Sequence, residues 1–396
     1  MAQQADTQLE KIVNAVSKGT PVYLFPYEEP KVWGVKGIGE YWYGAEAQPK
    51  SSTAVIGEDR CPMAEVLARV PGAVLGGKAI GKFGHMLPLV KILTPKGRLS
   101  VQFHDAKNEL WIVTGTNSTV AGGEPKLIVG FSRRSVDGYG EKVTEKYGEA
   151  LREYGKVLNA LIDKLEADKD GKAALDRTKD VRKAAEELKG KIPALERSLG
   201  ELDSAQTKLE SFYNYFTVGI GDVVPIPSGT LHALGPGVEV VEPQIAGPTQ
   251  SLEDGTTYPV RYYFPGFERP GAQKKLDIDR VDEMNPAFTP KTHPEVINEA
   301  AGCVTERLPG NFEDKGLEVH RISMSKGATL DQLSLTSFHD LVCVKGKAEL
   351  LTGEMKYEIP KAVSGGEMLL VPASAGSYTI TALEDTQLID TFTPTS

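Results

Sequence analysis

The sequence predicts a mainly β protein that is interrupted by one helical segment. Short apolar runs broken by glycine and proline fill residues 21–130, and similar runs return after residue 212. Between them, residues 140–212 are rich in lysine, glutamate, alanine and leucine, with few glycines or prolines. A chain of 396 residues is also too long for one small core, so two or three units are expected.

The first β region contains apolar runs with the length and composition of strands. They read PVYLF, LPLVKIL, RLSVQF, ELWIVTG and KLIVG. Such runs, rich in branched and aromatic side chains and bounded by turn formers, are typical of an all-β unit.

The middle segment shows helical periodicity. Two stripes of large apolar residues recur at intervals of three and four: Leu151, Tyr154, Leu158, Leu161 and Leu165, then Leu195, Leu199, Leu202 and Leu209. The sequences DKDGKAA and KGKIP are expected turns, which predicts two or three antiparallel helices. The charge runs here are interpreted as solvated helix faces.

Strand patterns resume in YFTVGIGDVVPIPSGTLHAL, GVEVVEPQ and YPVRYYF, and a proline-rich linker, NPAFTPKTHPEVINEAAG, precedes a last β-rich stretch. The helices are therefore predicted to be inserted into the first β unit. We place the two halves of that unit at 1–136 and 212–290, the helical insertion at 137–211 and a C-terminal β unit at 291–396.

Composition excludes several classes of protein. The net charge of −9 argues against a nucleic-acid-binding surface and against attraction to anionic membranes. No apolar run has the length of a membrane span or a signal peptide. Three widely spaced cysteines (Cys61, Cys303 and Cys343) form neither a disulfide framework nor a cysteine zinc site, and they fit a reducing cytoplasm.

A set of metal-binding side chains interrupts the strand pattern of LSVQFHDAKNELWIV. Gln102 and His104 share one face of a strand, and Glu109 can reach the same point from the next strand after a tight turn. A fourth ligand, His232, begins a strand after the turns of GDVVPIPSGTLHAL. An imidazole pair with a carboxylate and an amide oxygen suits zinc or another divalent first-row metal.

Both blocks resemble the paired motifs of the cupin superfamily. The first reads Gln102, Phe103, His104, four residues, Glu109, five residues and Gly115, and the second reads Gly221, five residues, Pro227, one residue, Gly229, two residues and His232. More specifically, SVQFH, KNELW and IPSGTLHALGPGVEVVE resemble type I mannose-6-phosphate isomerases, also called phosphomannose isomerases. WGVKGIGEYWYGAEAQP, LPLVKIL and GGEMLLVPASAGSYTI extend the resemblance over most of the chain.

This resemblance implies two cupin (jelly-roll-like) barrels with an inserted helical domain. It implies one zinc ion per chain, held by Gln102, His104, Glu109 and His232. The C-terminal barrel is expected to lack a metal site, because Ser377 stands where a histidine ligand would be.

The family also implies roles for four further residues. Either Lys107 or Glu242 is expected to transfer the proton, Arg261 to handle charge at the pocket mouth, and Ser100 to contact the substrate phosphate. Two features depart from the family pattern: only four residues separate His104 from Glu109, and the usual T-Y-R-x-Y has become TYPVRYY around Arg261.

The activity implied is interconversion of mannose 6-phosphate and fructose 6-phosphate, with a small sugar phosphate as the partner. The alternatives are a related sugar-phosphate isomerase, a metal-binding bicupin without turnover and, last, an oxygenase. His85, His293, His320 and His339 lack partners at ligand spacing and are interpreted as structural, and the glycine–lysine pairs of GGKAIGKFG lack a nucleotide-binding context. The sequence does not predict an oligomeric state.

Overall fold

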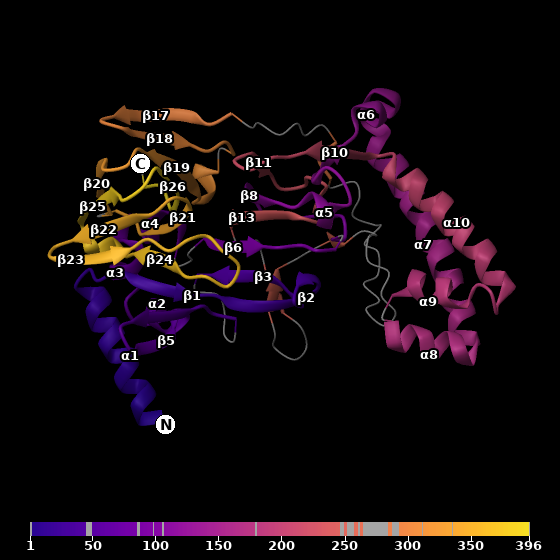
Figure 1. The fold of residues 1–396 in the computed structure, drawn as a ribbon, viewed down its shortest axis with the longest axis horizontal. Coiled ribbons are helices and arrows are strands. Elements are labelled where there is room, and N and C mark those ends of the chain that lie inside the picture. The colour runs from indigo at the N-terminus through magenta and orange to yellow at the C-terminus, as the bar shows by residue number, and fades with distance from the viewer. Residues whose placement is uncertain are drawn as a thin grey trace.

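The computed structural model confirms a mainly β protein. It describes residues 2–44, 50–84, 88–97, 99–104, 107–178, 180–245, 249–251, 257–259, 262–263, 284–286, 293–310, 312–334 and 336–395. Its strands pair antiparallel into several sheets, and the longest helices stand beside them (Figure 1).

The largest sheet has nine strands and combines both ends of the chain. In pairing order they are β17 (Glu295–Ala300), β18 (Cys303–Arg307), β19 (Glu318–Met324), β26 (Thr386–Phe392), β21 (His339–Lys345), β24 (Met368–Val371), β1 (Val22–Phe25), β4 (Thr53–Ile56) and β5 (Asp59–Pro62). The junction is the pair β1–β24, where Val22 lies opposite Leu370.

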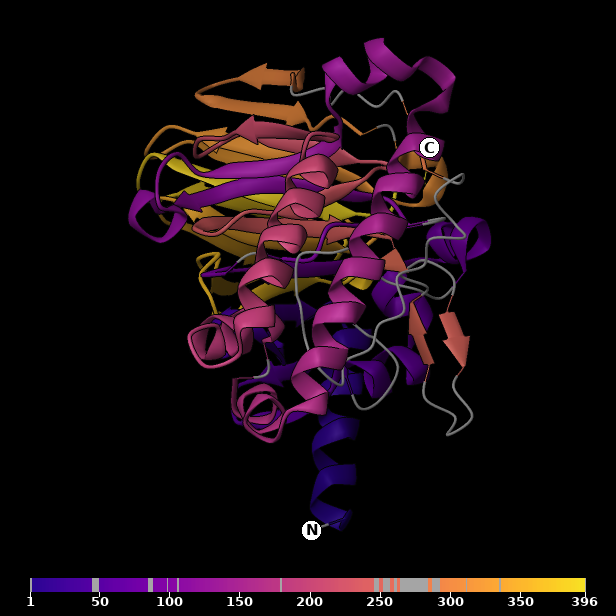
Figure 2. The same ribbon diagram turned by 90° about the vertical axis from the view of Figure 1, so that its right-hand side faces the viewer.

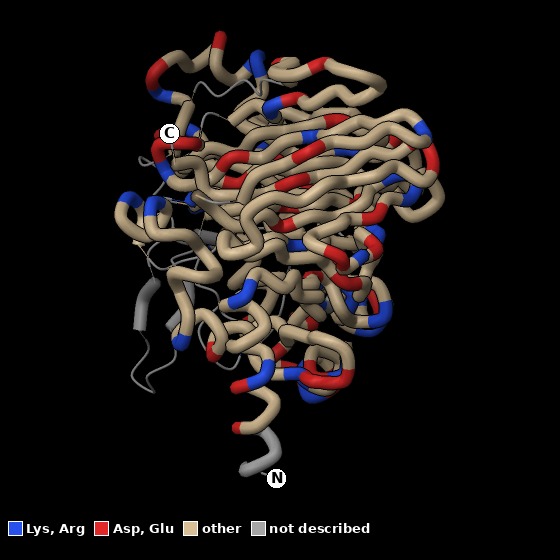
Figure 3. The backbone as a smooth tube through the Cα atoms, turned by 90° about the vertical axis from the view of Figure 1, so that its left-hand side faces the viewer, with Lys and Arg blue, Asp and Glu red and all other residues tan. Residues whose placement is uncertain are grey.

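A four-stranded sheet covers one face of this nine-stranded sheet. Its strands are β20 (Thr329–Leu333), β25 (Ser377–Ala382), β22 (Ala348–Thr352) and β23 (Met355–Glu358). Charged residues of both signs lie along and around these strands (Figure 3), and two pairs, Lys356–Glu349 and Lys347–Glu358, link neighbouring segments. The inner side buries apolar residues, as expected of an antiparallel sheet with one face in water.

Two further sheets carry the candidate site. A six-stranded sheet contains β11 (Val223–Ile226), β8 (Glu109–Thr116), β13 (Val238–Gln244), β6 (Leu89–Leu93), β3 (Ile38–Tyr43) and β2 (Tyr27–Val35). A five-stranded sheet contains β10 (Tyr213–Thr217), β9 (Lys126–Phe131), β12 (His232–Leu234), β7 (Gln102–Phe103) and β16 (Tyr262–Tyr263). A small pair, β14 (Thr249–Ser251) and β15 (Thr257–Pro259), completes the described strands.

The four main sheets stack as layers. Alternate residues of a strand point to opposite faces, so the two faces of one sheet contribute to different cores. Val113 and Val240 of the six-stranded sheet face the five-stranded sheet, whereas Ile112 and Val241 face the nine-stranded sheet. A third core fills the space between the nine- and four-stranded sheets. The six- and nine-stranded sheets therefore share the middle core.

Helices fill the ends of this β stack. The short helices near the N-terminus are α1 (Ala2–Ser17), α2 (Met63–Arg69), α3 (Pro71–Leu75) and α4 (Gly77–Phe83), with α5 (Ser118–Ala121) in a loop. The predicted insertion is helical: α6 (Arg133–Tyr139), α7 (Val143–Ala167), α8 (Lys169–Thr178), α9 (Val181–Leu188) and α10 (Pro193–Glu210). Single-turn helices lie at Gly140–Lys142, Glu313–Lys315 and Ala373–Ala375. None of the described helices is long and apolar enough to span a membrane.

The two predicted stripes form the core of the insertion. Apart from the partly buried Leu158, they are buried where α7 and α10 pack together (Figure 2). Tyr147 fixes this unit to the five-stranded sheet: its ring meets Phe131 edge-on at 5.5 Å, and its hydroxyl lies 3.4 Å from that of Tyr213.

The first turn of α9 depends on a side-chain cap. Asp180 Oδ1 accepts a hydrogen bond from the Lys183 N–H at 2.9 Å. We expect Asp180→Ala to lower the free energy of unfolding by about 1 kcal/mol, because the first turn of the helix loses its side-chain acceptor. Urea unfolding followed by circular dichroism measures this loss. Asp180→Asn keeps a capping oxygen and is the matched control; equal losses in both variants would contradict the capping role.

The six-stranded sheet and part of the nine-stranded sheet repeat one another. Their pairing orders correspond strand for strand, β11-β8-β13-β6-β3-β2 with β24-β21-β26-β19-β18-β17. The registers correspond as well: Glu109–Ile226 with His339–Val371, Glu242–Lys91 with Asp390–His320, and Lys91–Trp42 with His320–Arg307. Even the register shift recurs, in β13–β8 and in β21–β26. The positions named in these registers thus have counterparts in the other sheet.

The finer part of the predicted fold is not confirmed. The pairings among the described strands close none of the sheets into a ring, so two cupin barrels remain a prediction. The segment boundaries at 136, 211 and 290 also stay a prediction. The three cysteines are buried and unpaired, in agreement with the absence of a predicted disulfide framework.

Candidate metal centre and active site

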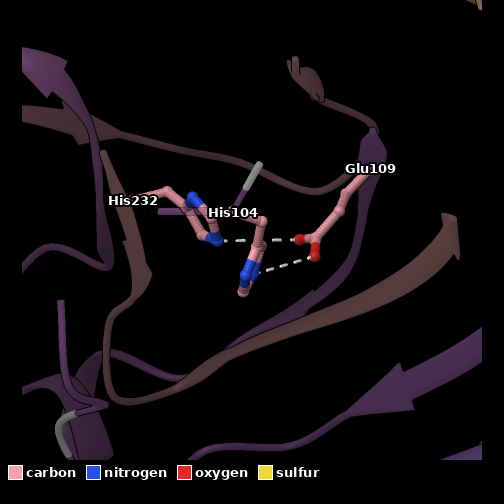
Figure 4. Close-up of side chains that lie close together, drawn as sticks. All are labelled: His104, Glu109 and His232. Carbon is pink, nitrogen blue, oxygen red and sulfur yellow. Dashed lines mark ion pairs between the residues drawn. The ribbon is translucent and has the colours of Figure 1, made fainter. Parts of the chain in front are cut away.

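Three side chains predicted as metal ligands converge between the five- and six-stranded sheets. His104 follows β7, Glu109 begins β8 and His232 begins β12, and at most 2% of each residue is exposed. Their potential ligand atoms lie within 4.8 Å of one another. Figure 4 shows both imidazoles aimed at the carboxylate, with His104 Nε2 at 3.3 Å from Oε1 and His232 Nε2 at 3.8 Å from Oε2.

Backbone pairing explains how residues so far apart in sequence meet. Gln102 and His232 lie directly opposite each other on β7 and β12. The turn before β12 is tied to the first block, since the Gly229 N–H donates to the His104 carbonyl oxygen at 2.7 Å. Gly229 has φ +81°, a conformation that favours glycine, and the Ser228 N–H donates to Asn108 Oδ1 at 2.9 Å.

The histidines are held in a state suited to metal binding. His232 Nδ1–H donates to the Thr230 carbonyl oxygen at 2.7 Å, which leaves the Nε2 lone pair facing Glu109. Burial, and next the Lys107 ammonium, hold the pKa of His104 well below its usual range, and burial also lowers the pKa of His232. Both rings are therefore neutral at neutral pH.

An unsatisfied nitrogen supports the metal interpretation. His104 Nε2, the ring nitrogen that faces Glu109, is buried with no hydrogen-bond partner among the residues the structure describes. Buried polar atoms normally find partners, so such an atom needs an explanation. Two neutral imidazoles and a carboxylate form a donor set that fits zinc, which binds nitrogen and oxygen ligands in tetrahedral sites.

Gln102 lies at the edge of this cluster. Its Nε2 is 3.5 Å from His232 Nε2, and its side chain is partly exposed. The oxygen and nitrogen of a side-chain amide exchange places by a rotation, so the Gln102 oxygen can turn to the same point. The structure thus brings Gln102 beside the cluster, and its role as the fourth ligand remains a proposal.

Lys107 is buried against the carboxylate of Glu109 and forms an ion pair with it. Burial alone would raise the pKa of Glu109, but the Lys107 ammonium holds it well below its usual range. The cluster therefore contains an ionised carboxylate at neutral pH, as a metal ligand must be.

A second buried acid lies next to the cluster. Glu242 Oε2 accepts a hydrogen bond from Trp111 Nε1 at 3.0 Å, and its Oε1 lies 3.6 Å from Lys91 Nζ. The Trp111 ring also meets the His232 ring edge-on at 5.4 Å. Burial, and next the Glu109 carboxylate, raise the pKa of Glu242 to about 7. The structure thus brings Glu242 beside the cluster, and its role in proton transfer stays a prediction.

Sequence reasoning missed two charged residues here. Lys91 and Glu40 are buried, with Lys91 Nζ at 3.5 Å from Glu40 Oε2, and Glu40 also accepts a hydrogen bond from Trp42 Nε1 at 2.8 Å. Lys31 Nζ lies 3.5 Å from Glu40 Oε1 and adds a third charged group to this cluster. A lysine inside the apolar run LPLVKIL and a glutamate inside GEYWY were the signals available in the sequence.

Two predicted residues are less well placed. Ser100 is partly exposed just before β7, and its contact with a phosphate stays a prediction. Arg261 lies outside the described residues.

In the C-terminal unit, the residues that the structure describes contain no further group of metal-ligating side chains, and Ser377 is exposed. His320 and His339 are paired with Glu318 and Asp390, which agrees with a structural role.

Comparison with known proteins places this fold. No family model and no curated protein matches the chain. Solved structures match it over 94% of its length: the mannose 6-phosphate isomerase from Bacillus subtilis has a TM-score of 0.58 and 16% identity, with 99% of that chain covered. A variant phosphomannose isomerase from Salmonella typhimurium gives the same four values.

A zinc-bound mannose 6-phosphate isomerase matches with a TM-score of 0.59, again at 16% identity over 94% of this chain and 99% of that chain. Identity at this level shows the fold alone. The resemblance predicted from the sequence motifs is confirmed at that level, and the chain has the fold of the mannose-6-phosphate isomerases.

Proposed function

We propose that the protein is a zinc-dependent aldose–ketose isomerase that interconverts mannose 6-phosphate and fructose 6-phosphate. The observation that carries the proposal is the buried cluster of His104, Glu109 and His232, in which the Nε2 atoms of both rings face a carboxylate beside a second buried acid. The fold shared with mannose 6-phosphate isomerases supports the same activity.

Four residues would hold one zinc ion per chain: Gln102, His104, Glu109 and His232. When bound, zinc supplies a Lewis acid that polarises the oxygens at the reacting carbons. The Thr230 carbonyl oxygen keeps His232 in the required tautomer, and Lys107 keeps Glu109 ionised.

Aldose–ketose isomerisation moves a proton between C1 and C2, so a group must take the proton and return it. Glu242 suits this task, because a carboxyl with a pKa of about 7 exchanges its proton at neutral pH. Trp111 and Lys91 each face one of its oxygens and fix its orientation. Lys107 is the alternative proton carrier in this proposal, and its cationic charge would stabilise a developing enediolate oxygen.

The phosphate of the substrate needs cationic or hydroxyl donors. We assign this task to Arg261 and Ser100, in keeping with the family resemblance. No nucleotide is required, since the phosphate is already part of the substrate.

The proposed architecture is two cupin (jelly-roll-like) barrels. The first would comprise residues 1–136 and 212–290, which form the five- and six-stranded sheets, with residues 137–211 as the inserted helical domain. The second would comprise residues 291–396, and β1, β4 and β5 of the first segment extend its nine-stranded sheet. The shared strand order and registers of the six- and nine-stranded sheets support this division.

Metal removal tests the proposed activity directly. We expect the zinc-loaded protein to convert mannose 6-phosphate to fructose 6-phosphate, to lose this activity with a chelator and to regain it when zinc is restored. The measurement is a coupled assay for fructose 6-phosphate. Turnover that persists in chelator would contradict metal dependence, and a folded, zinc-loaded protein that leaves mannose 6-phosphate unchanged would contradict the substrate.

A further inference from the structure

Gln244, the last residue of β13, is buried beside the candidate metal centre and has an unsatisfied oxygen. Only 1% of the residue is exposed, and its Oε1 has no hydrogen-bond partner among the described residues. The metal and proton-transfer roles above do not use it.

The backbone determines which way this side chain points. Gln244 lies directly opposite Glu109 in the β13–β8 pair, and residues opposite each other on paired strands share a face. It also follows Glu242 by two residues, so both side chains lie on the same face of β13. Glu109 and Glu242 both point into the site, toward His104 and Trp111 respectively. The Gln244 amide therefore lies in that layer as well.

The repeat in the nine-stranded sheet provides an internal comparison. By register, His339 is the counterpart of Glu109, Asp390 that of Glu242 and Phe392 that of Gln244. These three residues contact one another. His339 Nδ1 lies 2.9 Å from Asp390 Oδ2, and the Phe392 ring stacks on the His339 ring with 5.0 Å between the ring centroids. In this repeat, where the described residues form no cluster of metal ligands, the counterpart of Gln244 is therefore an apolar ring.

The chemistry of the free atom limits its partner. An amide oxygen only accepts hydrogen bonds, so the missing partner must be a donor. A phosphate monoester is largely the dianion at neutral pH and then has no hydrogen to donate, which argues against the phosphate group of a substrate as this partner. A neutral hydroxyl is the donor that a sugar offers.

We infer that Gln244 is a substrate-binding residue that accepts a hydrogen bond from a hydroxyl group of the sugar. The inference rests on the proposed isomerase function and adds the orientation of the substrate. The polyol part of the sugar lies against the end of β13, and the phosphate points away from it.

The decisive variant is Gln244→Leu, which keeps the volume of the side chain and removes its polar atoms. We expect kcat/KM for mannose 6-phosphate to fall about tenfold, since one hydrogen bond to substrate is lost. The inhibition constant of inorganic phosphate should stay unchanged, because phosphate binds elsewhere. In the absence of ligand, the melting temperature should rise by about 2 °C, because a buried unsatisfied oxygen is removed.

The rise in melting temperature separates this role from a structural one. A glutamine that only stabilised the fold would lower the melting temperature when replaced by leucine. Gln387→Leu is the matched control. Gln387 also lies on a strand, but outside the site, and its side chain donates a hydrogen bond to Ser323 Oγ. Its replacement should leave turnover unchanged.

Two failures are distinguishable in this experiment. A wild-type protein without turnover of mannose 6-phosphate overturns the proposed function and this inference with it. Wild-type turnover that Gln244→Leu matches overturns the inference alone, and so does a variant whose inhibition by phosphate weakens as much as its kcat/KM.

Discussion

His104→Ala is expected to abolish zinc binding and to reduce kcat/KM by more than about a hundredfold. Residues that merely orient a metal ligand affect metal affinity by about 10- to 100-fold, so loss of a ligand should cost more. His104 is buried and faces Glu109, and no other imidazole among the described residues can replace it beside His232. Zinc content after dialysis and the rate of isomerisation measure the two effects.

His293 provides the matched control for this variant. It is an exposed histidine, and His293→Ala should keep both full zinc content and full activity. A His104→Ala protein that still retains one zinc ion per chain would show that the metal lies elsewhere. The variant should remain folded, since His104 Nδ1 has no hydrogen bond to lose among the described residues.

Glu242→Gln is expected to change how stability depends on pH in the metal-free protein. The pKa of Glu242 is raised to about 7 in the folded state, above the value of about 4.5 that the unfolded chain would have. Between these two values the folded protein holds a proton that the unfolded chain releases, so wild-type stability falls as pH rises through this window. The full change corresponds to about 3 kcal/mol.

The glutamine variant lacks this titration. The difference in unfolding free energy between Glu242→Gln and wild type should therefore grow in favour of the variant from pH 4.5 to pH 8. Urea unfolding at several pH values, with chelator present, measures it. A constant difference over this range would refute the raised pKa. The variant should also lose turnover at neutral pH, because an amide cannot accept and return a proton.

The fold class was predictable because its signals are local. Strand-like runs and helical stripes depend on the spacing of neighbouring residues, and Leu151 and Leu195 are buried in α7 and α10 as their spacing predicts. Which strands pair to form the nine-stranded sheet was not predictable in this way. The pairing of Val22 with Leu370 depends on the packing of the whole chain, which no local pattern records.

The residues of the candidate site were also predictable only where a local motif contains them. His104, Glu109 and His232 were found because they lie in motifs with fixed spacing, and the structure brings them together. Lys91 and Glu40 were missed, since a single charge in an apolar strand has no sequence partner to reveal its role. Their ion pair exists only because β3 and β6 lie next to each other in one sheet.

The junction between β1 and β24 has a consequence for how the protein folds. Strand β1 pairs with β24, which lies more than 340 residues further along the chain, and β4 and β5 reach the sheet only through β1. Contacts between such distant residues close late and slow folding. Strands β1, β4 and β5 therefore stay unpaired with the rest of their sheet until β24 is available, and truncation before residue 368 would leave these strands exposed to aggregation.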